Sequence, residues 1–198
     1  MTLILASQSA SRRAMLEAAG VPFEAVRAGV DEEAAKAGLG AAGIDGRNLA
    51  DALAEMKALK VSMRSPGALV LGCDSVVQLA DGTMLDKPET RDQADEHLRR
   101  LSNGIHSLYS AAVVAENGQP VWRHVDRAKL HVRRLSDAFL EKYLNVEWPA
   151  IAGCVGCFRI EGPGVQLFNK IEGDHFTVLG LPLMNVLGYL RTRGYLAS

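Results

Sequence analysis

The pattern of apolar and polar residues at the start of the chain predicts a strand, a tight loop and a helix. Residues 2–6 form a short apolar run, which is typical of a buried strand. Ser9 stands where a capping residue is expected, just before the helical stretch of residues 12–19, and Gly20 ends that stretch. A second strand is predicted at residues 23–26.

Residues 48–64 repeat their apolar side chains with the period of a helix rather than that of a strand. Leu49 and Leu53 lie on one stripe of this predicted helix, and the Pro66-Gly67 pair ends it. The preceding residues 31–46 are rich in Ala, Gly and acidic residues. That composition predicts a mobile connector without firm secondary structure.

Strands and helices interleave through the rest of the chain. The turn pairs Asp81-Gly82 and Asn117-Gly118 predict hairpins, the first between residues 76–79 and 83–85 and the second within residues 105–132. Further strands are predicted at residues 68–71, 158–160 and 176–179, and further helices at residues 90–101, 136–144 and 183–191. The sequence therefore predicts one domain, residues 1–198, with an α/β fold: a mixed, mostly antiparallel elongated sheet with flanking helices.

Composition limits the kinds of partner the protein can have. The chain has 198 residues, of which 48% are hydrophobic and 23% charged, which is typical of a globular protein with a substantial core. Its 22 basic residues nearly cancel its 23 acidic ones. This balance gives no overall electrostatic footprint for a nucleic acid polymer or an anionic membrane, so any phosphate binding must be local.

Two features lead us to expect a cytoplasmic protein. The apolar run near the start is too short for a signal peptide or a membrane span. The cysteines Cys73, Cys154 and Cys157 are odd in number and sparse, unlike the disulfide framework of a secreted domain. We expect them to be reduced thiols.

The first candidate site is the loop that opens the first helix. Ser7, Ser9, Arg12 and Arg13 combine small hydroxyl residues and guanidinium groups at a predicted helix N-terminus. Backbone N–H groups and the positive end of the helix dipole favour phosphate at such a place. The alternative is a capped helix with two solvated arginines.

Acidic residues form the second candidate group. Asp74 follows the apolar residues 68–71, and we expect it at the carboxyl end of that strand, where open α/β sheets bind ligands. A carboxylate there suits a divalent ion or a general base, although a lone Asp after a strand is also typical of a turn or cap. Glu32 is a weaker candidate of the same kind.

Lysines form the third group. Lys57 lies on the apolar side of its predicted helix, where its charge is costly unless it meets an anion or snorkels to water. Lys87 stands just before Pro88, which favours extended backbone and would fix the lysine as a phosphate clamp. An ordinary turn lysine is the alternative for Lys87.

Cys154 and Cys157 have the spacing of a zinc or redox pair. A zinc site needs two further ligands with matching spacing, which we do not find, and a redox pair normally opens a helix. We therefore expect buried, inert cysteines. Asp174-His175 has the residue types of a metal site, but we favour a polar turn there.

The order of these motifs resembles the Maf family of nucleoside triphosphate pyrophosphatases over nearly the whole chain. The resemblance is carried by residues 3–7 with Arg12-Arg13, Val30-Asp31-Glu32, Lys57-Ala58, residues 72–77 around Asp74, Asp86-Lys87-Pro88, residues 101–106, residues 161–164, residues 171–174 and residues 178–183. In this family the corresponding segments read Ile-Asp-Glu, Lys-Ala, Gly-Lys-Pro, Leu-Ser-Gly-x-x-His and Val-Val-Gly-Leu-Pro-Leu.

The resemblance implies two lobes around a nucleotide cleft, a homodimer, and Mg²⁺ or Mn²⁺ as cofactor. It assigns Asp74 as the active-site acid, Glu32 as a residue near the metal, and Arg12, Arg13, Lys57 and Lys87 as phosphate-side groups. It also implies hydrolysis of a nucleoside triphosphate, standard or modified, to a monophosphate and pyrophosphate by water attack at the α phosphorus.

Ser11, Ser75 and Glu161 are the residues we expect to affect base specificity. The spacing from Ser7 to Arg12-Arg13 resembles the 7-methyl-GTP branch more than the dTTP/UTP branch, although that branch has Trp where Ser11 stands. Glu161 stands where pyrimidine-preferring relatives carry Gln, and an ionised carboxylate suits the adjacent donors of guanine. The alternative is that Glu161 faces solvent or a lysine. The lysine of the family's Asp-Lys-Ala-Gly-Ala-Tyr motif has no counterpart here.

Two other classes of function remain open from the sequence. A non-catalytic nucleotide-binding regulator of septum formation would keep the same phosphate loop, although it would not explain Glu32, Lys57, Asp74 and Lys87 together. A thiol redox protein using Cys154 and Cys157 would leave the same four residues unexplained.

Overall fold

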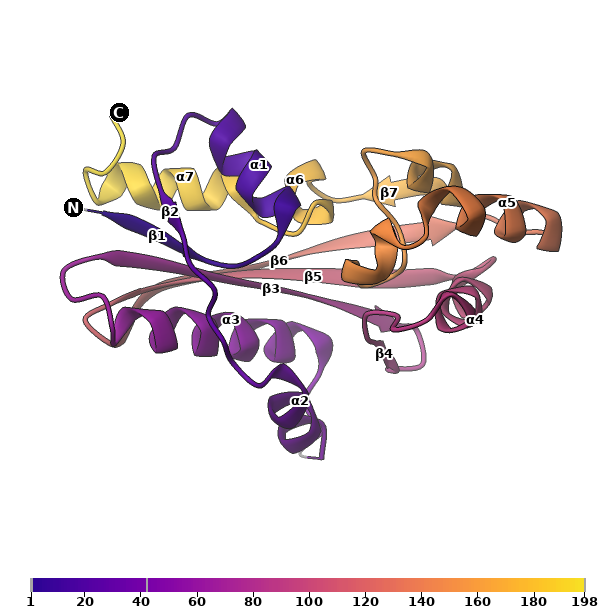
Figure 1. Cartoon of the computed structure of the whole chain (residues 1–198), viewed down its shortest axis with the longest axis horizontal. Coiled ribbons are helices and arrows are strands. Elements are labelled where there is room, and N and C mark those ends of the chain that lie inside the picture. Colours follow the sequence, from indigo (N-terminus) through magenta and orange to yellow (C-terminus); the bar gives the residue numbers. More distant parts are fainter. Residues whose placement is uncertain (1, 42, 198) are drawn as a thin grey trace.

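A mixed seven-stranded sheet forms the centre of the computed structural model, which describes residues 2–41 and 43–197 (Figure 1). The strand order is β2-β1-β3-β5-β6-β7, and β4 pairs with β3. Only the pairings of β1 with β2 and with β3 are parallel. The predicted mixed, mostly antiparallel α/β fold is therefore confirmed. The strands are β1 (Leu3–Ala6), β2 (Glu24–Ala25), β3 (Leu69–Leu79), β4 (Met84–Leu85), β5 (Ile105–Glu116), β6 (Gln119–Val132) and β7 (Phe168–Glu172).

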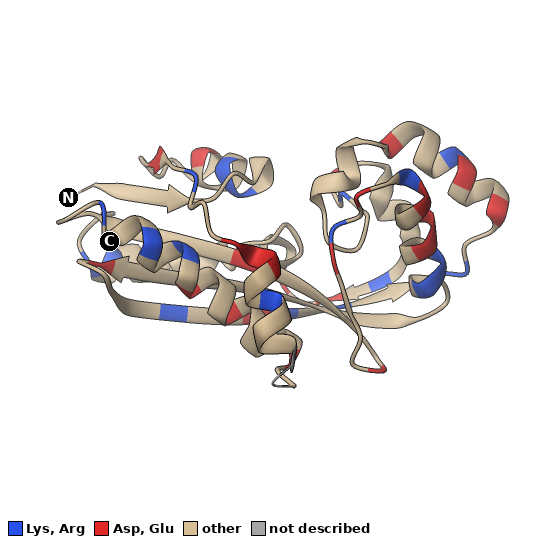
Figure 2. Ribbon diagram, turned by 60° about the horizontal axis from the view of Figure 1, so that its bottom comes forward, with Lys and Arg blue, Asp and Glu red and all other residues tan. Residues whose placement is uncertain are grey.

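Helices cover both faces of the sheet at one end, and a second group of helices packs around its other end (Figures 1 and 2). α3 lies on one face, and α1, α6 and α7 lie on the opposite one, while α4 and α5 pack around the far half of the long strands. The helices are α1 (Ala10–Ala18), α2 (Glu32–Ala41), α3 (Gly46–Ser62), α4 (Arg91–Leu101), α5 (Asp137–Glu147), α6 (His175–Val178) and α7 (Leu183–Thr192), with 3₁₀ turns η1 (Ala150–Gly153) and η2 (Pro163–Leu167). No helix among the described residues is both long and apolar enough to cross a membrane.

The long strands β3, β5 and β6 run through both halves, and the buried apolar residues pack against the sheet in separate clusters. Leu3, Leu71 and Leu16 belong to the core under α1 and α7, whereas Leu98 and Leu130 belong to the core between α4, α5 and the sheet. Burial of such apolar side chains is the main stabilising contribution in each half.

A glycine sets how closely α3 approaches the sheet. A Cβ at Gly72 would lie 2.2 Å from the carbonyl oxygen of Ala54 and 2.6 Å from the amide nitrogen of Ala58. The helix therefore rests directly on β3 at this point. This contact brings Lys57, which lies between those two helix residues in the sequence, close to the segment that follows Gly72.

The prediction of a mobile connector at residues 31–46 is wrong, because most of these residues form α2. Asp31 Oδ1 accepts a hydrogen bond from the amide of Ala34, and Glu32 and Glu33 occupy the first turn, where negative charge is favourable. The alanines have high helix propensity and outweigh the interspersed glycines. Residue 42 of the predicted connector lies outside the described residues.

Two predicted strands near the C-terminus are also wrong. Residues 158–160 form no strand, because the chain turns there and the amide of Gly162 donates to the carbonyl of Arg159. Residues 176–179 belong largely to α6, which Asp174 caps by accepting from the amides of Phe176 and Thr177. The strand in this region is β7, which pairs with the end of β6.

Candidate active site

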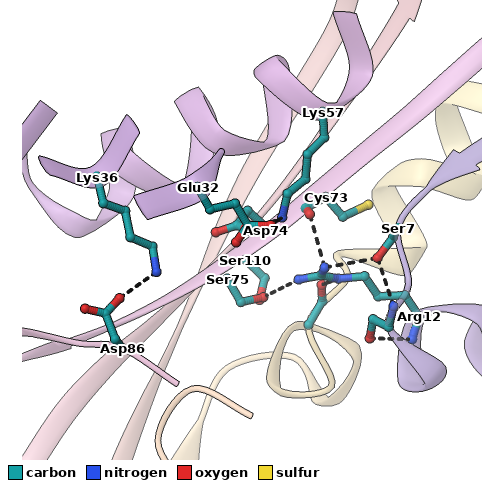
Figure 3. Close-up of polar contacts among 12 residues, drawn as sticks. Ser7, Arg12, Glu32, Lys36, Lys57, Cys73, Asp74, Ser75, Asp86 and Ser110 are labelled. Atoms are coloured by element: carbon teal, nitrogen blue, oxygen red, sulfur yellow. Dashed lines mark hydrogen bonds and ion pairs between the residues drawn. The ribbon is translucent and has the colours of Figure 1, made fainter. Parts of the chain in front are cut away.

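Lys57 joins two carboxylates that come from different elements (Figure 3). Its Nζ lies 2.5 Å from Asp74 Oδ1 on β3 and 2.8 Å from Glu32 Oε1 at the start of α2. Lys57 and Asp74 are buried, with 7% and 6% of their surface exposed, while the Glu32 side chain is 31% exposed. The structure thus brings together three of the residues that we singled out in the sequence, and it pairs the buried lysine with anions.

Asp74 does not lie at the end of its strand, as we expected from the sequence. β3 continues to Leu79, so Asp74 lies in its middle. The strand edge is nevertheless open at this point: β1 pairs with β3 only as far as Gly72, and β4 begins its pairing at Val77. Among the residues that the structure describes, no strand pairs with this edge of β3 in between, so the edge is accessible to side chains.

Arg12 occupies that open edge. Its guanidinium donates from Nη1 to the carbonyl of Cys73, at 3.1 Å, and from Nη2 to Ser75 Oγ, at 2.9 Å. Nη1 also contacts Ser7 Oγ at 3.4 Å, and Nε donates to the carbonyl of Gly180 at 2.7 Å. Gly180 has a φ of +101°, a conformation that favours glycine, and its carbonyl thereby reaches Arg12.

The buried Arg12 has hydrogen bonds but no carboxylate partner within the described part of the chain. Its positive charge therefore remains uncompensated beside the start of α1. Ser9 caps that helix by accepting from the Arg12 amide, and Ser7 Oγ accepts from the Ser9 amide. Arg13 is exposed on the same helix. This arrangement suits an anion better than a cation.

Three lysines place positive charge around Glu32. Burial raises the pKa of this carboxyl group, but the hydrogen bond from Lys57 and the charges of Lys57, Lys87 and Lys36 outweigh that effect and leave the pKa below its usual value. Lys87 is exposed on the segment between β4 and α4. Glu32 is therefore ionised at neutral pH, as a ligand for a cation or an acceptor for a proton must be.

Asp74 and Glu32 fit a magnesium or manganese ion by their chemistry. Both contribute carboxylate oxygens, which these hard cations prefer, and both converge on the one nitrogen of Lys57. No group of three or more His, Cys, Asp or Glu suited to a metal occurs among the described residues. Two carboxylates with water and substrate phosphates are nevertheless a common set for Mg²⁺.

Ser11 and Glu161, 150 residues apart, lie at the same place. Ser11 Oγ donates to Glu161 Oε1 at 3.4 Å, so Glu161 lies beside the first turn of α1. Ser75, the third residue expected to affect base specificity, instead contacts Arg12 and Ser110 Oγ, the latter at 3.0 Å. Ser75 therefore helps to hold the Arg12 guanidinium in place.

Several residues of this region could not be assigned a role from the sequence. Ser110 and Lys36 did not stand out, whereas Gly180 and Asp86 were noted only as members of family-like motifs and not for their contacts with Arg12 and, at 2.5 Å, with Lys36. Ser110 lies opposite Ser75 in the β3–β5 register, and its Oγ donates to the carbonyl of Thr177. Serines and glycines are too common for such contacts to be recognised before the register is known.

Cys157 is a buried thiol, as expected, whereas Cys154 is only partly buried. Cys154 and Cys157 are free, and burial raises the pKa of Cys157 to about 12 and also raises the pKa of Cys154. A thiol with so high a pKa is protonated at neutral pH and reacts slowly. Asp174 caps α6 and His175 is the first residue of that helix, so the polar turn that we expected here before a strand is instead a helix N-terminus.

Comparison with known proteins reveals clear relatives. The family described as "Maf: Maf-like protein" matches residues 2–193. A "Nucleoside triphosphate pyrophosphatase" of Sphingopyxis alaskensis is 54% identical over 194 residues, 98% of each chain. A protein of the same name from Caulobacter vibrioides is 53% identical over 192 residues, 97% of this chain and 96% of its own. Among solved structures, a HAM1 protein from Coxiella burnetii has a TM-score of 0.44 and 16% identity, covering 68% of this chain and 75% of its own.

Proposed function

The chain belongs to the Maf family, and on that premise we propose that it is a nucleoside triphosphate pyrophosphatase that releases a nucleoside monophosphate and pyrophosphate. The observation that carries the proposal is the contact of Lys57 with both Asp74 and Glu32, next to the uncompensated charge of Arg12. Carboxylates and cationic groups that converge in this way serve chemistry on a polyphosphate, where both proton transfer and charge neutralisation are needed.

The cationic residues divide the work of binding the substrate. A nucleoside triphosphate carries roughly four negative charges at neutral pH, and charge on the leaving pyrophosphate increases as the bond breaks. Arg12 is fixed by four acceptors and so offers its charge without reorganisation, while Lys57 and Lys87 face the site from α3 and from the segment after β4. Such preorganised cations stabilise the transition state more than the ground state.

The two carboxylates would act on the attacking water and hold the cation. Asp74 and Glu32 would bind Mg²⁺ or Mn²⁺, which, when bound, neutralises phosphate charge and favours deprotonation of water. One carboxylate of the pair accepts a proton from the water while the oxygen of that water attacks the α phosphorus. The bond between the α phosphorus and the bridging oxygen breaks, and the electron pair leaves with pyrophosphate.

A non-catalytic nucleotide-binding regulator is the alternative. A protein that only bound the triphosphate would gain nothing from two carboxyl groups beside the phosphates, because negative charge there repels the ligand. The pairing of both with one buried lysine therefore favours the enzyme.

Incubation of the protein with a mixture of nucleoside triphosphates and Mn²⁺ tests the proposal. We expect monophosphates and pyrophosphate, resolved by anion-exchange chromatography, and no diphosphate. Orthophosphate as the primary product, in an assay without added pyrophosphatase, would place the attack at another phosphorus. Tight binding without any product would favour the regulator.

A further inference from the structure

Lys36 lies on α2 one helical turn beyond Glu32, and its side chain extends to the segment that carries Lys87. Lys36 Nζ is 2.5 Å from Asp86 Oδ1, and Figure 3 shows this pair beside Glu32, Lys57 and Asp74. The Lys36 side chain is 26% exposed, whereas that of Asp86 is 70% exposed. Lys36 is therefore the more buried partner of this pair, and Asp86 is the more exposed one.

The ion pair can exchange its anion at little cost. Solvent screens a pair with one largely exposed member, so its contribution to stability is small. A polyphosphate offers several charged oxygens to the same ammonium group, whereas Asp86 offers a single carboxylate. A ligand bound by Arg12, Lys57 and Lys87 would thus compete well with Asp86 for Lys36.

We propose that Lys36 is a further phosphate-binding residue of this site, and that Asp86 is the anion that holds it when no polyphosphate is bound. This inference rests on the proposed function, since it assigns Lys36 to the phosphates of the same substrate. Asp86 also repels the ligand and draws Lys36 away from it. The pair therefore sets the affinity of the site without being needed for the chemical step.

A purely structural role for the pair makes a different prediction. If the contact only ties α2 to the segment after β4, neutralising either partner breaks the same bond and has the same effect. If Lys36 binds phosphate, the two neutralising variants have opposite effects, because one removes the ligand's partner and the other removes its competitor.

Titration calorimetry with inorganic pyrophosphate and Mg²⁺ distinguishes these cases. We expect K36Q to weaken pyrophosphate binding about tenfold, the loss of roughly one charge-assisted hydrogen bond, and D86N to strengthen it about threefold. The matched control is K170Q, because Lys170 forms an exposed ion pair with Glu172 on β7. K170Q should bind like the wild type, and thermal unfolding should show that all three variants are folded.

Changes in the same direction for K36Q and D86N, or a K36Q affinity within twofold of wild type, would overturn the inference. The KM of a hydrolysed triphosphate should follow the same order, with kcat changing less. A wild type that binds pyrophosphate but cleaves no triphosphate would refute the proposed function and not the role of Lys36. Normal cleavage by the wild type, together with an unchanged pyrophosphate affinity of K36Q, would refute only the role of Lys36.

Discussion

Lys57 Nζ lies 2.5 Å from Asp74 Oδ1, and both side chains are only 8% exposed. Charges this far from solvent are costly unless each has a partner, so the pair is conformationally fixed as well as electrically balanced. Glu32, which also contacts Lys57, gives the cluster a net negative charge. That excess charge favours a cation, and Glu32 is the partly exposed member of the cluster, with 31% of its side chain exposed.

Replacing Asp74 by Asn should abolish turnover and leave the protein folded. The amide can still accept a hydrogen bond from Lys57, but it cannot take a proton from water and is a poor ligand for a hard cation. We expect kcat to fall by at least about 100-fold, a typical contribution of general base catalysis. Circular dichroism and a steady-state pyrophosphate assay measure the two effects.

The matched control is Asp81→Asn, in the exposed turn between β3 and β4. This variant should retain the wild-type rate. Activity of Asp74→Asn within about twofold of wild type would remove Asp74 from the mechanism.

Arg12 and Arg13 should differ in their effect on stability. The Arg12 guanidinium donates to four acceptors at once, and a lysine has neither the planar fork nor the reach to replace it. We expect Arg12→Lys to lower the free energy of unfolding by about 1–3 kcal/mol and to raise the KM for triphosphate. The exposed Arg13→Lys should stay within about 0.5 kcal/mol of wild type. Urea unfolding of both variants checks this, and equal stabilities would contradict it.

Local sequence signals predicted most of the fold, and failed where tertiary contacts decide. The Asn117-Gly118 pair defines the β5–β6 hairpin, and Ser9 and Thr90 cap their helices as expected. One failure has a local cause instead: most of residues 176–179 lie in α6 despite their β-prone composition, because Asp174 caps that helix. The continuity of β3 through Gly72 depends on its pairing with β5, which no local signal contains.

The candidate site was predictable only in part for the same reason. Lys57 could be recognised because a charge on an apolar helix stripe requires an anion, and Asp74 because it follows an apolar run. Their contact depends on the close approach of α3 at Gly72. The acceptors of Arg12 at Cys73 and Gly180 are backbone carbonyls, which have no signature in the sequence.

His106 should make stability depend on pH. Its side chain is 2% exposed, neither ring nitrogen has a hydrogen-bond partner among the described residues, and burial lowers its pKa to about 4. Because the folded pKa lies below the unfolded value of about 6.5, the unfolded chain binds the proton first as the pH falls. The contribution of His106 to the free energy of unfolding is therefore fully present above about pH 6.5 and decreases from there toward pH 4.

Urea unfolding at pH 7.5 and pH 5.0 measures this effect. Between these two pH values the free energy of unfolding should fall by about 2 kcal/mol more in the wild type than in His106→Leu, whose side chain does not titrate. His175→Gln removes an exposed histidine and is the control, so it should follow the wild type. Equal losses in wild type and His106→Leu would show that His106 is not the titrating group.

Glu161 should favour guanine-type triphosphates over pyrimidine ones. Its contact with Ser11 places the exposed carboxylate beside the first turn of α1, next to the helix start that we propose as a phosphate-binding site. Arg159, two residues earlier, is held by a bidentate pair with the buried Glu147, which fixes the backbone of this segment. An ionised Glu offers only acceptors, which match the adjacent N1–H and N2 amino donors of guanine but oppose the carbonyl O4 of uracil or thymine.

The comparison of kcat/KM for 7-methyl-GTP, GTP, UTP and dTTP tests this prediction. A mismatched polar contact costs about 1–3 kcal/mol, so we expect a preference of roughly 10- to 100-fold for the guanine-type substrates. Glu161→Gln should narrow or reverse the preference, because the amide can donate to O4 and accept from N3–H. Glu141→Gln, an exposed change on α5, is the control and should keep the wild-type ratios. If the wild type prefers UTP or dTTP, or if Glu161→Gln leaves the ratios unchanged, Glu161 does not contact the base.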